Sequence, residues 1–124
     1  MLPDHALMRQ NLVVSLLLSL SPPTLAMSIF SPSDGVICDK ASNFCADRHG
    51  ISIALTVKYL GSQAQERLLK VLGESTDGNL WEYTLSNGVH CDSHEKQCYS
   101  DRYYPRTKAK QESKFTNKIF GISQ

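Results

Sequence analysis

The chain has 124 residues, a formal net charge of +1 and four cysteines. This length excludes more than one domain, and the core of so small a domain is marginal unless it is reinforced. The charge is unevenly spread, because residues 27–101 carry six Lys or Arg against ten Asp or Glu, whereas residues 102–124 carry six against one. The sequence therefore indicates a mildly acidic body with a basic C-terminal tail.

The N-terminus has the pattern of a secretory signal peptide. Residues 12–20 are apolar except for two serines, with an arginine before them and two prolines after them. The small residues Thr24 and Ala26 resemble a cleavage site. The apolar run is too short for a membrane span, which needs about 20 residues. We therefore expect residues 1–26 to be removed from an exported protein, and Met8 is an alternative start that the sequence leaves open.

One phrase occurs twice along the chain. Residues 33–39 read S-D-G-V-I-C-D and residues 86–92 read S-N-G-V-H-C-D, and a second cysteine follows each phrase after five residues. An even number of cysteines in a short exported chain is typical of a disulfide framework. Residues that face each other across a hairpin lie within disulfide range. The spacing therefore predicts the bridges Cys38–Cys45 and Cys91–Cys98, although spacing alone leaves the crossed pairings open.

The first copy reads as strands joined by tight turns. Asp34-Gly35 is a turn signal, residues 36–39 form the outgoing strand and residues 44–46 the returning strand. Ile29 and Phe30 supply an incoming strand at an edge, because the following proline has no backbone N–H to donate.

Two short helices are predicted between the copies. Ser52 caps the first, which carries apolar residues at positions 55, 59 and 60 and ends at Gly61. Ser62 with Gln65 is a capping-box pattern for the second, which ends at Gly73. Its apolar positions, expected to be buried, are Ala64, Leu68, Val71 and Leu72.

The second copy predicts a three-stranded antiparallel meander over residues 80–104. Trp81, Tyr83 and Leu85 alternate with polar residues, which indicates a half-buried strand. Asn87-Gly88 predicts a type I′ turn, which needs positive φ at both central residues.

Together these elements predict a small α+β domain over residues 27–104. Two disulfide-closed hairpin units form one antiparallel sheet, with the two helices between them on one face. For the basic tail, residues 105–124, two alternatives stay open. The tail is disordered, or its four apolar residues dock at its end: Phe115, Ile119, Phe120 and Ile122.

Several short motifs resemble the YcgJ-like family of small exported bacterial proteins, also labelled as similar to a Fels prophage protein. They are G-V-I-C-D at 35–39, C-A-D at 45–47, Y-L-G at 59–61, N-G-V-H-C-D at 87–92 and C-x-x-D-R-Y at 98–103. The resemblance covers residues 31–104 and leaves out the signal peptide and the basic tail. It implies a one-domain protein of the bacterial envelope or a secreted one, and it transfers no activity and no catalytic residue.

Four residues suggest acid-base catalysis or metal binding. Asp39 and Asp92 occupy the same place in both copies, and His90 and His94 flank Cys91. Two carboxyl groups could act as acid and base, and the histidines could add metal ligands. The structural alternative is that an Asp after a hairpin cysteine accepts backbone N–H bonds in the turn.

The sequence favours the structural alternative. It contains no nucleophile motif such as G-x-S-x-G, and the cysteine spacing matches neither a zinc site nor a C-x-x-C redox motif. We expect no enzyme activity, no catalytic residue, no metal and no cofactor. A small metal-dependent or acid-base hydrolase that uses Asp39, Asp92 and His90 or His94 is the alternative.

A surface for binding is suggested by aromatic residues of the meander, since rings with a polar tip suit interfaces with proteins and sugars. They are Trp81, Tyr83, Tyr99, Tyr103 and Tyr104. The alternative for Trp81 and Tyr83 is the core face of the sheet.

We therefore expect a monomeric periplasmic or secreted protein that is a binding or accessory protein of the envelope, with a protein or glycan as its partner. A purely structural or prophage-derived accessory protein without a ligand is a further alternative. The basic tail would add weak contact with anionic surfaces. A nucleic-acid partner is not expected, because no recognition motif is present.

Overall fold

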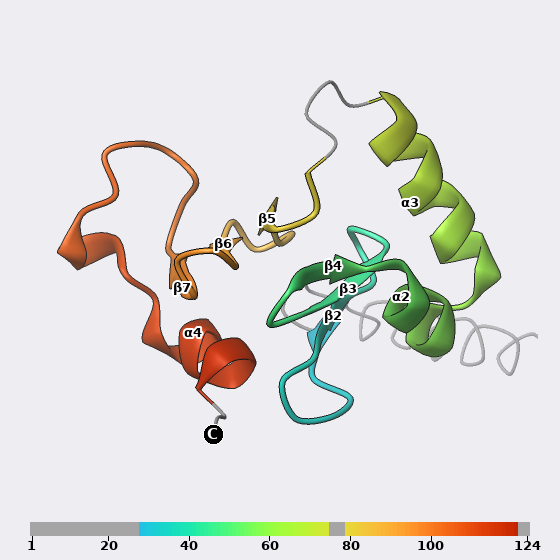
Figure 1. The fold of residues 1–124 in the computed structure, drawn as a ribbon, viewed down its shortest axis with the longest axis horizontal. Helices are drawn as coiled ribbons and strands as arrows, with labels where there is room; N and C mark the ends of the chain where they lie inside the picture. Colours follow the sequence, from blue (N-terminus) through green and yellow to red (C-terminus); the bar gives the residue numbers. More distant parts are fainter. Residues whose placement is uncertain (1–27, 75–78, 122–124) are drawn as a thin grey trace, which may run out of the picture.

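The structure, a computed structural model, describes residues 28–74 and 79–121. The predicted signal peptide, residues 1–26, lies outside the described residues. The strands occupy the middle of the molecule, with α2 and α3 at one side and α4 beneath β7 at the other (Figure 1). Among the described residues, no helix has the length and apolar character needed to cross a bilayer.

The first sheet has four antiparallel strands in chain order. Three were expected, and the fourth follows a short turn after the third, so that Ser52 faces Cys45. The fourth strand ends where the first helix begins. The strands are β1 (Ile29–Phe30), β2 (Ile37–Asp39), β3 (Phe44–Asp47) and β4 (Gly50–Ser52).

Both predicted helices are present, as α2 (Ile53–Leu60) and α3 (Ser62–Glu74). Ser52 caps α2, because its hydroxyl accepts a hydrogen bond from the backbone N–H of Leu55 at 3.0 Å. Ala64 and Leu68 are buried and Leu72 packs against the core. The prediction for Val71 is wrong, since it is 62% exposed. Val71 lies at the edge of the stripe formed by the other three, on the side opposite Leu72.

The second sheet has three antiparallel strands, β5 (Glu82–Thr84), β6 (His90–Asp92) and β7 (Gln97–Tyr99). The turn before β6 differs from the prediction. Gly88 has φ of 95°, whereas Asn87 is not among the residues with positive φ. The backbone N–H of Gly88 bonds to the carbonyl of Leu85 at 2.9 Å, so the loop is a three-residue connection with glycine in the left-handed position.

The two hairpin units form two sheets and not the single sheet expected. Among the described residues, one backbone hydrogen bond joins them, from the N–H of Ile51 in β4 to the carbonyl of Leu80 at 2.8 Å. At this junction Gly50 has φ of 118°, and a Cβ there would lie 2.3 Å from the carbonyl oxygen of Leu80. The backbone of β4 therefore contacts the chain at Leu80 closely at Gly50, and the two sheets do not pair beyond this point.

Both predicted disulfides are confirmed. Cys38 faces Cys45 across β2 and β3, and Cys91 faces Cys98 across β6 and β7, with Cα atoms 4.0 Å apart in each pair. The two copies also share their turn geometry. Asn43 and Lys96, each five residues after the first cysteine of its pair, both have positive φ, at 62° and 57°.

The described part of the C-terminal segment, residues 105–121, contains helical elements, whereas Ile122 lies outside the described residues. A short 3-10 helix η2 (Lys108–Lys110) leads into α4 (Ser113–Phe120). Ile119 is 2% exposed and belongs to the main core, against which Phe115 and Phe120 also pack.

The helix α4 contacts the second sheet in the same way as α2 contacts the first, through a threonine hydroxyl. The hydroxyl of Thr56 in α2 accepts a hydrogen bond from the N–H of Cys45 at 2.9 Å. The hydroxyl of Thr116 in α4 accepts one from the N–H of Cys98 at 2.8 Å. Each hydroxyl also donates to the carbonyl four residues earlier. The repeat is therefore a hairpin with a helix, and we refer to residues 29–60 as the first unit and residues 82–120 as the second unit.

Candidate functional site

The two repeated aspartates have the structural role of the turn alternative. Oδ1 of Asp39 accepts hydrogen bonds from the N–H groups of Ala41 and Ser42, at 3.1 and 3.4 Å. Oδ1 of Asp92 accepts bonds from the second and third residues after it in the same way, at 2.9 and 3.0 Å. Each carboxyl group therefore stabilises the turn between the two cysteines of its unit.

The second oxygen of each aspartate binds a different distant segment. Oδ2 of Asp39 accepts from the backbone N–H of Ser86 at 2.6 Å, whereas Oδ2 of Asp92 accepts from Arg106 Nη1 at 2.9 Å. Ser86 lies at the turn of the β5–β6 hairpin, and Asp92 pairs with Glu82 at its other end. Four residues of extended chain span roughly 13 Å, so the carboxyl groups do not form an acid-base pair. The geometry gives the hydrolase alternative no support.

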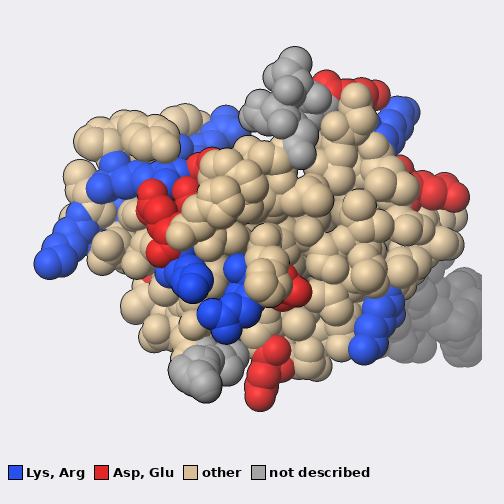
Figure 2. All heavy atoms as spheres, viewed as in Figure 1, with Lys and Arg blue, Asp and Glu red and all other residues tan. Residues whose placement is uncertain are grey.

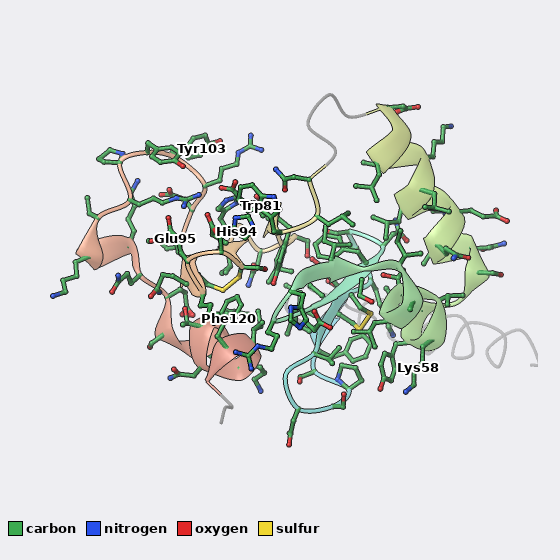
Figure 3. The ribbon with its side chains drawn as sticks, in the orientation of Figure 1. Lys58, Trp81, His94, Glu95, Tyr103 and Phe120 are labelled. Carbon is green, nitrogen blue, oxygen red and sulfur yellow. A yellow bond between two sulfur atoms is a disulfide. The ribbon has the colours of Figure 1, made fainter. Side chains whose placement is uncertain are left out.

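The two histidines point to different neighbours. His90 is buried, with Nδ1 2.8 Å from the hydroxyl of Thr84 and Nε2 2.8 Å from Oε2 of Glu82. His94 stacks on the indole ring of Trp81, with ring centroids 4.0 Å apart, and Figure 3 shows the two side by side. Within the described ranges no group of three or more His, Cys, Asp or Glu side chains is arranged to hold a metal.

The centre of the second unit is a cluster of acidic groups around one guanidinium. Arg106 donates to Asp92, to Oε2 of Glu95 at 2.7 Å and to Oε2 of Glu82. Its guanidinium also lies 5.1 Å from the ring centroid of Tyr99 and 4.9 Å from that of Tyr104. One side chain from the C-terminal segment thus ties together β5, the end of β6 and the following turn.

This cluster changes the acidity of its members. Burial alone would raise the pKa of Asp92, but the hydrogen bonds from Arg106 and from two backbone N–H groups outweigh it, so that the pKa of this carboxyl is lowered. Burial alone would lower the pKa of Arg106, but its hydrogen bonds to Asp92 and Glu95 outweigh this effect, so that the pKa of this guanidinium is raised. The hydrogen bond that Tyr99 donates to Glu95, with burial, raises the pKa of this phenol to about 12.

Next to the cluster lies a loop that carries two exposed tyrosines. Tyr103 is 62% exposed and Tyr104 is 73% exposed, and Figure 3 shows Tyr103 at the outer margin of the molecule. Lys110 Nζ donates to Oδ1 of Asp101 at 3.2 Å and to the carbonyl of Tyr103 at 3.1 Å. The Arg106 guanidinium lies against the ring of Tyr104. We refer to residues 100–107 as the tyrosine loop.

Of the five aromatic residues predicted to form a binding surface, the structure buries some and exposes others. Tyr83 and Tyr99 are buried, and burial raises the pKa of Tyr83. Trp81 is half-buried beneath His94. Tyr103 and Tyr104 are the two that face outward, because the chain leaves β7 after Tyr99. Sequence reasoning missed Arg106 and Glu95, since no local pattern distinguishes them from other charged residues of the basic tail and the turn.

The tyrosine loop is also where the two units differ most. In the first unit, residues 48–52 connect β3 to α2, whereas residues 100–112 connect β7 to α4 in the second. The longer connection carries most of the basic residues of the tail, and Figure 2 shows Lys and Arg gathered on the side of the molecule formed by the C-terminal elements. The two units thus differ most in the length and charge of the connection between the last strand and the helix.

Comparison with known proteins gives two matches. The family model described as YcgJ protein matches residues 29–120, from the start of β1 to the end of α4. The expectation that the resemblance ends at residue 104 and leaves out the basic tail is therefore wrong. A protein of Escherichia coli (strain K12) described as uncharacterized protein YcgJ is 45% identical over 74 residues, which are 60% of this chain and 56% of that protein. The matched region is thus little more than half the length of this relative. No solved structure matches the chain.

Proposed function

The chain belongs to the YcgJ family, and we propose that it is an exported, non-enzymatic protein of the cell envelope that binds a protein or glycan through the tyrosine loop. The observation that carries this proposal is the exposure of Tyr103 and Tyr104 on a loop whose base is tied by Arg106 and Lys110. Two disulfides are typical of a protein that works in an oxidising compartment.

A held loop with exposed aromatic rings favours binding for an energetic reason. Ordering a flexible loop and its side chains costs free energy on association, and a loop that is already ordered avoids much of that cost. Tyr and Arg are also the residue types enriched at the energetic centres of interfaces. The tyrosine loop offers both, because Arg102 lies 5.3 Å from the ring centroid of Tyr103. Loops on a rigid scaffold are common places for recognition.

Photo-crosslinking in the producing bacterium tests the proposal. Tyr103 is replaced by benzoylphenylalanine, cells are irradiated, and exported products are identified by mass spectrometry. We expect one discrete adduct, protein or glycan, on a chain that begins at Met27 and is lighter than its reduced form by two hydrogens for each disulfide.

The matched control places the same amino acid at Val71, which is equally exposed but lies on α3. The adduct should be absent there. A second variant, Tyr103→Ser with Tyr104→Ser, should leave the free energy of unfolding within about 0.5 kcal/mol of the wild type and lose the partner. Identical adducts at both positions, or none at either, would show that the loop binds nothing specific.

A further inference from the structure

A pocket of about 200 Å³ lies on the first unit, between the β2–β3 turn and the corner where α2 meets α3. The tyrosine loop belongs to the other side of the molecule, beyond the strands (Figure 1). The pocket is lined by polar side chains from three elements, which are Lys40, Asn43, Tyr59, Gln63 and Arg67. We propose that it binds a sugar that carries a carboxylate group, a hexuronic acid.

Both walls of the pocket are attached to the first disulfide hairpin. The carboxyl group of Asp39 accepts hydrogen bonds from two backbone N–H groups of the turn, and the Cys38–Cys45 bridge joins the two strands that lead into it. On the other wall, the hydroxyl of Thr56 binds the N–H of Cys45 and holds α2 against the same hairpin. The walls are therefore in place before a ligand binds, which lowers the free energy cost of association.

Three cationic side chains surround the pocket. Lys40 and Arg67 line it, and Nζ of Lys58 lies 5.2 Å from the ring centroid of Tyr59. None of the three has an ion pair within residues 28–74 and 79–121. A negatively charged ligand would therefore meet cations that are not already neutralised.

The carboxyl groups of the neighbouring chain do not line the pocket. Asp39 is fully buried and accepts hydrogen bonds from its own turn and from Ser86. Glu66 is exposed and lies about 100° around α3 from Arg67, on the face opposite the buried stripe. Asp34 belongs to the β1–β2 turn and lines two other pockets. The local charge of the pocket is therefore positive.

The polar side chains favour a sugar acid over a simple anion. Lysine and arginine only donate hydrogen bonds, and the planar guanidinium fits a carboxylate through two parallel bonds. The amides of Asn43 and Gln63 both donate and accept, and neither makes a side-chain hydrogen bond among the described residues. A sugar hydroxyl also donates and accepts, whereas a simple carboxylate ion has no proton to offer an amide oxygen.

One wall of the pocket is apolar, which suits the face of a sugar ring. It is formed by Tyr59 and Leu60 beside the buried Ala64, and a tyrosine ring combines an apolar body with a polar tip. Nζ of Lys40 lies 5.5 Å from the ring centroid of Phe30. The pocket is smaller than the sites of about 300–1,000 Å³ that take drug-sized ligands, so it admits a single ring.

NMR titration of the mature protein with glucuronate tests the proposal. We expect saturable shifts of the amides at residues 40–43 and 59–67, with a dissociation constant of about 1 mM. Acetate supplies the carboxylate alone and glucose the ring alone, and at matched ionic strength each should bind roughly tenfold more weakly. A response to acetate or to glucose as strong as the response to glucuronate, or no saturable response to glucuronate, would overturn the proposal.

Variants of α3 separate direct contact from general charge. Arg67→Gln should weaken glucuronate binding about tenfold, because it removes a charged donor, and Arg67→Lys should restore only part of the affinity, because it lacks the paired donors. Lys70→Gln is the matched control, since Lys70 is exposed on the same helix and does not line the pocket. It should change the affinity by about twofold at most.

The amide spectrum outside the pocket should be the same in all three variants, which checks that each one folds. Equal loss of affinity in Arg67→Gln and Lys70→Gln would show that only the charge of the helix matters, and would contradict a site at this pocket.

Discussion

At the scale of single residues, the repeated aspartates show how one position takes on two tasks. One carboxyl oxygen of Asp39 and of Asp92 closes the turn of its own hairpin, and the other oxygen reaches a segment far away in sequence. Asp39 is fully buried and its partners are backbone N–H groups and the Ser86 hydroxyl. Asp92 is paired with a guanidinium instead. Equivalent residues thus acquire different electrostatic surroundings.

The lowered pKa of Asp92 makes a prediction about pH. A carboxyl whose pKa is lower in the folded than in the unfolded chain stabilises the fold above its ordinary value of 3.8, and this contribution is lost as the pH falls through the folded-state pKa. We expect Asp92→Asn to lower the free energy of unfolding by about 2 kcal/mol at pH 7. The difference from the wild type should shrink below about pH 4.

Urea unfolding followed by circular dichroism at several pH values measures this difference. Asp34→Asn is the matched control, because Asp34 is exposed and its replacement should change stability by less than about 0.5 kcal/mol. A gap between wild type and Asp92→Asn that stays constant from pH 7 to pH 3 would contradict the assigned role of the Arg106 pair.

At the scale of elements, each helix is joined to its hairpin by a threonine hydroxyl. Thr56 and Thr116 satisfy the backbone N–H of the second cysteine in each pair. A backbone donor next to a buried disulfide has no access to water, so its bond to the helix fixes where the helix docks. The same device occurs twice although the helices have different sequences.

Replacement of these threonines by valine should destabilise both units. Thr56→Val leaves the N–H of Cys45 without a partner in a fully buried place and should cost about 1–3 kcal/mol. Thr116→Val should cost less, because Thr116 is half-buried. Thr107→Val is the control, since the exposed Thr107 makes no side-chain cap bond. Thermal unfolding measures all three, and an equal effect of Thr56→Val and Thr107→Val would refute the role of the hydroxyl.

Local elements could be predicted from the sequence because their causes are local. The alternation of apolar residues, the cap at Ser52 and the cysteine spacing each act over a few residues, and the strands, helices and disulfides they indicate are present. The predictions that were wrong concern features that depend on contacts between segments distant in sequence. The separation into two sheets depends on the contact of Gly50 with Leu80, and the loop around Gly88 depends on the bond that Ser86 makes to Asp39.

The binding features were harder to predict for the same reason. The alternation of apolar residues at positions 81–85 predicted a strand and offered burial in the core as the alternative to surface exposure for Tyr83. The structure confirms that alternative, because Tyr83 is buried. No sequence pattern indicated that Arg106 would reach three carboxyl groups, or that the turn at residues 40–43 would meet the start of α3 at one pocket. These are encounters between segments that are remote along the chain.

At the scale of the whole molecule, the C-terminal segment completes the second unit. It supplies Arg106 to the acidic cluster, Thr116 to the disulfide hairpin and Ile119 to the core. The first unit contains its own helix within residues 29–60. The stability of the second sheet should therefore depend on residues that the charge pattern alone assigns to a solvated tail.

Truncation after Tyr104 tests this dependence. We expect hydrogen exchange of the amides in β6 and β7 to accelerate strongly, while those in β2 and β3 keep more of their protection, because local stability follows local contacts. Truncation after Gly121 is the control, since it keeps α4 and its contacts. Unchanged exchange in β6 and β7 after the longer truncation would show that the segment contributes nothing to the second sheet.

The bond between Asp39 and Ser86 has a consequence for symmetry. In an isologous pairing of two identical subunits, each contact occurs twice, with the roles of the partners exchanged. The counterpart of Asp39–Ser86 would join Asp92 to Ser33, since these residues hold the equivalent places in the two copies of the repeated phrase. Asp92 binds Arg106 instead. The fold thus contains the Asp39–Ser86 contact without its symmetric counterpart. Asp92 is therefore available to bind Arg106 in the tyrosine loop, where the second unit differs most from the first.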